Sequence, residues 1–116
     1  MKISSYTGGM VQTNGYLVET PNGNIIVDAP AGIAQWAARP GVRVDDLLLT
    51  HQHYDHVEDV AALAAAGAKV HAFAPFSPEL TLEASARAWG MPITVPPYQV
   101  DSLLEVGQPL QFAGLE

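Results

Sequence analysis

The sequence Leu47-Leu48-Leu49-Thr50-His51-Gln52-His53-Tyr54-Asp55-His56 joins a short apolar run to three histidines and an aspartate. The run Leu47 to Leu49 is bounded by polar residues, which predicts a short strand buried on both faces. His51 and His53 are two positions apart, so in extended backbone their side chains leave on the same side and can bind one ion. Asp55 and His56 follow at the start of the next element, where they can face a second point nearby.

The residue types in this cluster suit metal chemistry. Neutral imidazole binds zinc and similar ions at about 2.0–2.1 Å, and a carboxylate compensates charge. Two ions roughly 3.5–4 Å apart can share a bridging water, lower its pKa and polarise the bond that it attacks. The competing interpretation is a set of solvated or core histidines on a loop, but ordinary composition makes a His-x-His-x-Asp-His arrangement rare. The cluster therefore predicts a hydrolytic metal site.

The stretch from Thr50 to His56, placed after a hydrophobic strand and before an alanine-rich helix, resembles the signature of the metallo-β-lactamase-fold hydrolases. The resemblance implies that His51 and His53 bind one metal and that Asp55 and His56 bind the other. Ile25-Ile26-Val27-Asp28 likewise resembles the family's early strand, which ends in an aspartate near the metals. The implied fold is an α/β αββα sandwich, of which residues 1–116 would be the amino-terminal half, a mixed β-sheet with flanking helices.

The resemblance implies metal-dependent hydrolysis of an ester, thioester, lactone or phosphoester in a small-molecule substrate, by a metal-bound hydroxide. Asp55 is also expected to orient the attacking water. Asp28 is expected either to orient a metal-binding histidine or to cap a local turn. Tyr54 is expected either to contact substrate or to pack. Two zinc ions are expected, although iron or manganese accepts the same nitrogen and oxygen ligands.

The chain holds only part of such a site, because a catalytic metal needs at least three protein ligands. The family takes its further ligands from beyond its amino-terminal half. After His56 the chain has only His71, expected to be structural, and then Asp101, expected to cap a turn. We expect a missing half or a second chain to complete the site. The alternative is a non-catalytic metal-binding or dimerising half-domain.

Composition narrows the class of protein. A length of 116 residues predicts one domain, and a formal charge of −7 with a pI of about 4.8 argues against a nucleic-acid partner. The absence of cysteine excludes disulfides and thiolate ligands. No signal-peptide core and no run long enough to span a membrane are found, so a cytoplasmic protein is expected.

Turn residues and apolar periodicity predict the elements before the motif. Strands are expected over Lys2–Tyr6 and Met10–Glu19, with Gly8-Gly9 as their turn and a bulge or interruption at Asn14-Gly15. Pro21-Asn22-Gly23 predicts a hairpin turn. Ile33, Trp36 and Ala37 share one face of a helix that Pro40 stops, and Trp36 is expected in the core.

Further elements are expected after the motif. They are a helix from Val57 to Ala64 with Glu58 and Asp59 as first-turn acids, a strand over Lys69–Phe73, and a helix capped by Ser77 that ends at Gly90. Leu82, Ala86 and Trp89 form the expected core stripe of that last helix. Pro92–Pro97 is expected to be irregular, and Val106–Glu116 to form a strand, a turn and the start of another strand.

Overall fold

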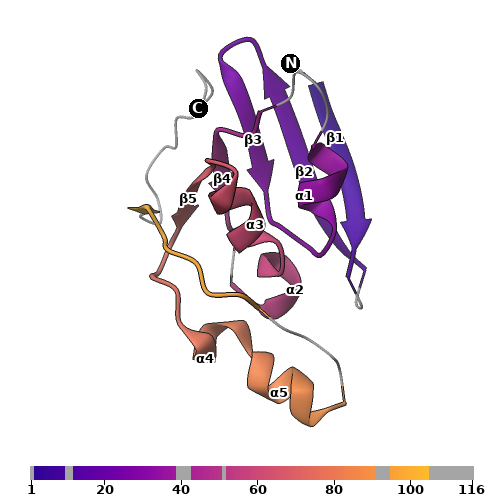
Figure 1. Cartoon of the computed structure of the whole chain (residues 1–116), viewed down its shortest axis with the longest axis vertical. Helices are drawn as coiled ribbons and strands as arrows, with labels where there is room; N and C mark the ends of the chain where they lie inside the picture. The colour runs from indigo at the N-terminus through magenta and orange to yellow at the C-terminus, as the bar shows by residue number, and fades with distance from the viewer. Residues whose placement is uncertain (1, 10–11, 39–42, 51, 91–94, 105–116) are drawn as a thin grey trace.

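The protein forms one mixed six-stranded sheet with its helices (Figure 1), as seen in a computed structural model that describes residues 2–9, 12–38, 43–50, 52–90 and 95–104. The strands are β1 (Lys2–Gly8), β2 (Thr13–Thr20), β3 (Gly23–Val27), β4 (Asp46–Leu48), β5 (Lys69–Ala72) and β6 (Ser102–Leu103). The helices are α1 (Ile33–Ala37), α2 (Tyr54–Val57), α3 (Val60–Ala65), α4 (Pro78–Thr81) and α5 (Glu83–Ala88).

The sheet runs in sequence order from β1 to β6. Its first three strands are antiparallel, and β3 to β6 are parallel. The hairpin between β2 and β3 is confirmed, with Gly23 at a φ of 147° that an L side chain rarely adopts. The predicted α/β class and mixed sheet are therefore confirmed.

One row of apolar side chains crosses four strands and forms the centre of the core. Leu17, Ile26, Leu47 and Val70 are paired in register and fully buried. Helices α1 and α3 lie in front of the sheet in Figure 1, and α2 lies below α3, beyond the lower end of β3. On each strand, the residues next to these four point to the opposite face of the sheet, where Leu48 is only half-buried. The prediction that Leu47–Leu49 is covered on both faces is wrong, because the helices of the described part of the chain cover only one.

Gly15 is a point of close approach and not a bulge. The β1–β2 ladder is regular there, pairing Tyr6 with Gly15. A Cβ at Gly15 would lie 2.5 Å from Ile33 Cδ1 and 2.8 Å from the Asp28 carbonyl oxygen. Glycine therefore lets α1 and the turn after β3 approach β2.

The helix expected from Val57 is two short helices. Helix α2 ends at Val57 and α3 begins at Val60, with Glu58 and Asp59 between them. The interpretation of these acids as the first turn of one helix is wrong. Asp59 instead accepts hydrogen bonds from the backbone N–H groups of Gly32 and Ala34, at 3.0 and 2.9 Å. It thereby caps α1, which lies far from it in sequence.

The expected helix from Ser77 to Gly90 is interrupted at Leu82, which has a φ of 60°. The Ser77 side chain makes no capping bond and donates to the Glu79 carboxylate. Ala86 is buried, but Leu82 is 38% and Trp89 70% exposed, so the predicted core stripe is wrong. The physical reason is that α5 lies at the periphery, away from the sheet (Figure 1), and only one side of it meets the core.

Other predicted residues have clear positions. Trp36 is partly buried against the core and its ring lies 5.4 Å from that of Tyr6. His71 is a hydrogen-bonded structural histidine, as expected, with Nε2 2.8 Å from Asp46 Oδ1. Asp101 is not a turn cap, because both of its hydrogen bonds are to Val70. The Val70 N–H donates to the Asp101 carboxylate, and the Asp101 N–H donates to the Val70 carbonyl, both at 2.8 Å.

Several predictions fall outside the described residues. They concern Met10 in the second strand, Pro40 as a helix stop, residues 92–94 of the proline-rich segment, and Val106–Glu116. Residues 95–97 are irregular, as predicted. Among the described residues, no helix is both long and apolar enough to cross a membrane.

Replacing Gly15 by alanine tests the close approach of α1 to β2. The added methyl group would overlap Ile33 and the Asp28 backbone, so Gly15→Ala is expected to lower the free energy of unfolding by about 1–3 kcal/mol. Urea titration followed by circular dichroism measures the change. Ser5→Ala, on exposed β1 surface, is the control and should stay within about 0.5 kcal/mol. Equal stability of the two variants would contradict the packing described here.

Candidate metal centre

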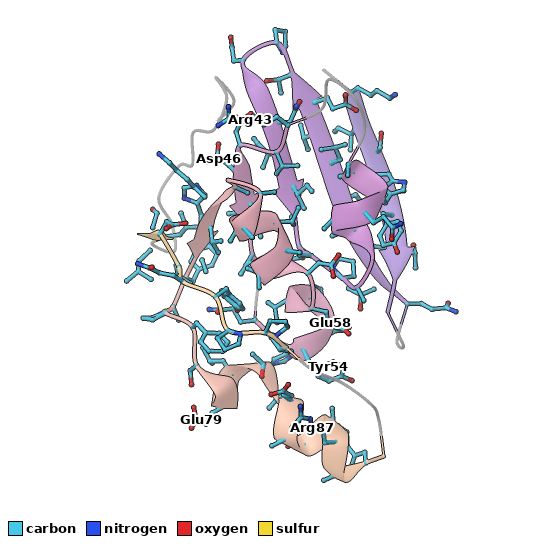
Figure 2. All side chains as sticks on the ribbon, in the orientation of Figure 1. Arg43, Asp46, Tyr54, Glu58, Glu79 and Arg87 are labelled. Carbon is cyan, nitrogen blue, oxygen red and sulfur yellow. The ribbon has the colours of Figure 1, made fainter. Side chains whose placement is uncertain are left out.

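The predicted ligands lie where β3 and β4 end and α2 begins. Asp28 follows β3, Thr50 lies two residues after β4, and the sequence from Tyr54 to Val57 forms α2. Figure 2 shows Tyr54 and Glu58 at this end of the sheet and Arg43 and Asp46 at the opposite end. The carboxyl ends of parallel strands are a common location for sites in α/β folds.

Asp28 connects the two strand ends. Its backbone is left-handed, with a φ of 62°, and its side chain is buried. The carboxylate accepts hydrogen bonds from the Thr50 N–H at 2.9 Å and from the Thr50 hydroxyl at 2.6 Å. Its Oδ2 also lies 3.1 Å from His56 Nδ1. These contacts reach across the fold, so the side chain does more than cap a local turn.

Asp55 and His56 bring a carboxylate oxygen and a ring nitrogen close together. His56 Nε2 lies 3.3 Å from Asp55 Oδ2. Two ligands on a tetrahedral ion with bonds of about 2.0–2.1 Å are about 3.4 Å apart, so this spacing fits a shared ion. Asp28 stands behind the other ring nitrogen of His56, in the carboxylate–histidine–metal arrangement common in metal sites.

The other predicted ligands and contacts differ in what the structure shows. His51 lies outside the described residues. His53 is exposed and extended, with φ −66° and ψ 151°, immediately before α2. Tyr54 begins α2 and is partly buried against the core, so packing accounts for part of its surface. Among the described residues, no three His, Asp or Glu side chains gather as one ion site.

Two residues at the site carried no signal in the sequence. Thr13, at the start of β2, donates its hydroxyl hydrogen to Asp55 Oδ2 at 2.7 Å. Gln52 is buried, although it lies within the motif, and its side chain is bonded to Tyr98 and Ala74. Their partners are 42, 46 and 22 positions away, so no local pattern reveals these contacts.

A shallow cavity of about 210 Å³ borders His53. Thr50, Gln52, Phe73, Ala74 and Leu80 line the rest of it. Phe73 and Leu80 are 44% and 41% exposed, which is high for large apolar side chains. The cavity therefore offers a mainly apolar wall beside a predicted ligand.

Acidic side chains gather at this end of the molecule. Burial, and then the charges of Asp59 and Asp55, raise the pKa of the Glu58 carboxyl. A cation bound by Asp55 and His56 would offset this concentration of negative charge.

Comparison with known proteins identifies the family. A family model described as "Metallo-beta-lactamase superfamily" matches residues 8–108 of this chain. The chain therefore belongs to the metallo-β-lactamase superfamily.

Three similar proteins show how much of the family domain the chain spans. "Thioesterase pkgB" of Emericella nidulans is 35% identical over 75 residues, or 56% of this chain and 22% of that protein. "Hydroxyacylglutathione hydrolase" of Fuscovulum blasticum is 47% identical over 49 residues, or 40% of this chain and 19% of that protein. TTHA1623, solved in a di-iron-bound form, is 36% identical with a TM-score of 0.71, and the match covers 92% of this chain and 56% of TTHA1623. The chain thus matches about a fifth of the two curated relatives and about half of the solved structure.

Replacing Glu58 by glutamine tests the acidic environment. A raised pKa means that the folded chain holds this proton more tightly than the unfolded chain does, so stability falls as pH rises through that pKa. In metal-free protein, Glu58→Gln should raise the free energy of unfolding at pH 7 by less than about 1 kcal/mol and leave it unchanged at pH 4 or below. Urea titrations at both pH values measure the difference.

Glu79→Gln is the matched control, because a hydrogen bond from Ser77 lowers the pKa of the exposed Glu79 carboxyl. This variant should gain no stability at pH 7. A gain from Glu79→Gln, or none from Glu58→Gln, would contradict the described electrostatics.

Proposed function

We propose that the complete protein is a metal-dependent hydrolase of a small molecule with an ester, thioester, lactone or phosphoester bond. The observation that carries the proposal is the spacing of Asp55 Oδ2 and His56 Nε2, 3.3 Å, with the Asp28 carboxylate behind His56. The printed names of two relatives, a thioesterase and a hydroxyacylglutathione hydrolase, support hydrolysis of an ester-like bond.

In this proposal Asp55 and His56 hold one ion, and His51 and His53 hold the other. A bound ion would supply a coordinated water of lowered pKa and a Lewis acid that polarises the bond under attack. The Asp28 carboxylate, with Oδ2 3.1 Å from Nδ1, would orient the His56 ring when Nε2 holds an ion. Asp55 would also orient the attacking water, and Thr13, at the start of β2, donates its hydroxyl hydrogen to Asp55 Oδ2. Tyr54 contacts the substrate from the first turn of α2.

Zinc is the proposed metal, as two ions. Its nitrogen and oxygen ligands are equally acceptable to iron or manganese, and the di-iron form of TTHA1623 supports iron as the alternative. We propose further that residues 1–116 correspond to the amino-terminal half of the family domain, and that another half or a second chain supplies the remaining ligands. The 56% coverage of TTHA1623 supports this correspondence.

The alternative function is a non-catalytic metal-binding half-domain that dimerises through its sheet. The observation in its favour is the sheet face that the helices leave uncovered, where Ile3 is 62% and Tyr16 39% exposed. Native mass spectrometry combined with a hydrolysis assay separates the two proposals, because the first reads covalent mass, oligomeric state and bound metal together and the second reads catalysis. A metal-bearing dimer with no hydrolytic activity would favour the alternative.

Removing one proposed ligand tests the metal centre. His56→Gln keeps a polar side chain but loses the imidazole nitrogen, so bound metal per chain is expected to fall. Native mass spectrometry after zinc loading measures the stoichiometry. His71→Gln is the matched control, since His71 is paired with Asp46 away from the motif, and it should keep the metal content of the unaltered chain. Unchanged metal content in His56→Gln would contradict the assignment.

Removing His53 tests hydrolysis in the complete protein. His53→Ala takes away a proposed ligand that is exposed, so we expect hydrolysis to be lost while folding is largely kept. Activity on a panel of esters, thioesters and lactones, with circular dichroism as the folding control, measures both. Full activity of His53→Ala with stoichiometric metal would reject the proposed mechanism.

A further inference from the structure

Gln52 occupies an unusual position within the motif. It lies between two predicted ligands, yet it is only 6% exposed, whereas His53 is exposed. Both polar atoms of its side-chain amide are hydrogen-bonded inside the protein. Nε2 donates to the Ala74 carbonyl at 2.8 Å, and Oε1 accepts from the Tyr98 hydroxyl at 2.6 Å. The Gln52 side chain therefore ties the motif to the chain segments that follow β5 and precede β6.

Tyr98 is itself held firmly. It is 8% exposed, and its ring packs edge-on against Phe76 with centroids 4.7 Å apart. Burial raises the pKa of the Tyr98 hydroxyl, so it stays protonated and remains a donor to Gln52. The segment that carries Tyr98 is also fixed at both ends. The Val95 N–H donates to Glu83 Oε1 at 2.6 Å, and the Asp101 N–H donates to the Val70 carbonyl at 2.8 Å.

The motif backbone is thus restrained from two sides. Asp28 holds the N–H and the hydroxyl of Thr50, and Tyr98 with Ala74 holds the Gln52 side chain two residues later. His53 is covalently next in line and carries no comparable burial of its own. The direction in which His53 leaves the backbone is set in part by where Gln52 is fixed and in part by the hydrogen bond from the His56 N–H to the His53 carbonyl at 2.9 Å.

We propose that Gln52 and Tyr98 are positioning residues for the metal centre: the Gln52 amide, held between the Tyr98 hydroxyl and the Ala74 carbonyl, sets the direction in which the motif presents His53 to its ion. This inference rests on the proposed function. Loss of the Tyr98 hydroxyl leaves a buried amide oxygen without its donor, and the side chain must shift to find another. Residues that support metal ligands in this way typically change metal affinity by about 10–100-fold when replaced.

The test uses the full chain and Co²⁺ alone as the probe. Tyr98→Phe removes the hydroxyl and keeps the ring that packs on Phe76. We expect the Co²⁺ dissociation constant to rise about tenfold and the visible absorption spectrum of the bound ion to change. Tyr6→Phe is the matched control, because it also loses one hydroxyl hydrogen bond, in this case to the Ala31 backbone carbonyl at 3.0 Å. It should bind Co²⁺ as the unaltered chain does.

A double-mutant cycle separates positioning from general destabilisation. Once Gln52→Leu has removed the amide, adding Tyr98→Phe should weaken Co²⁺ binding little further, because the two residues act as one unit. Amide hydrogen exchange on the metal-free chain gives a second readout. Exchange at Thr50 and His56 should speed up in Tyr98→Phe, whereas exchange in the β2–β3 ladder should not.

The outcomes distinguish this inference from the function on which it rests. Equal Co²⁺ affinity and spectra in the unaltered chain and Tyr98→Phe would overturn the positioning role and leave the metal centre standing. Fully additive effects in the cycle would also overturn it, since they would mean that Tyr98 acts only through stability. No Co²⁺ binding by the unaltered chain would overturn the proposed function and this inference with it.

Discussion

The buried carboxylate of Asp28 makes the contacts on which this end of the protein depends. It accepts two hydrogen bonds from Thr50 and faces His56 Nδ1 at 3.1 Å, so it joins the end of β3 to the chain that follows β4 and to α2. The left-handed backbone at Asp28 turns the chain sharply after β3. Left unpaired, the buried Asp28 carboxylate would cost stability, and its hydrogen bonds restrain the motif relative to the sheet.

Backbone contacts reinforce this arrangement. The Ala29 N–H donates to the His56 carbonyl at 2.8 Å, and the Asp59 N–H donates to the Ala29 carbonyl at 3.0 Å. The Asp59 side chain then caps α1, which begins at Ile33. The turn after β3 and the turn after α2 therefore form one hydrogen-bonded unit. The break between α2 and α3 follows from this, because Asp59 serves α1 instead of extending a helix of its own.

The same packing concentrates negative charge. Burial, and then the charges of Asp59 and Asp55, raise the pKa of the Glu58 carboxyl. Acids clustered at strand ends raise the energy of the metal-free state, and a cation that binds between Asp55 and His56 would relieve it. Membership of the metallo-β-lactamase superfamily agrees with this electrostatic arrangement. The arrangement links the fold to the proposed hydrolytic chemistry.

The sequence by itself determined the β2–β3 hairpin and the location of the motif after β4, because apolar periodicity and turn residues are local, and its resemblance to the family implied the mixed sheet. It also indicated the family through the spacing from His51 to His56. The tertiary structure decided what depends on distant partners. These are the close approach at Gly15, the break between α2 and α3, the exposure of Trp89, and the bonds of Thr13 and Gln52. Each of them is set by a surface or polar group far along the chain, which no local pattern encodes.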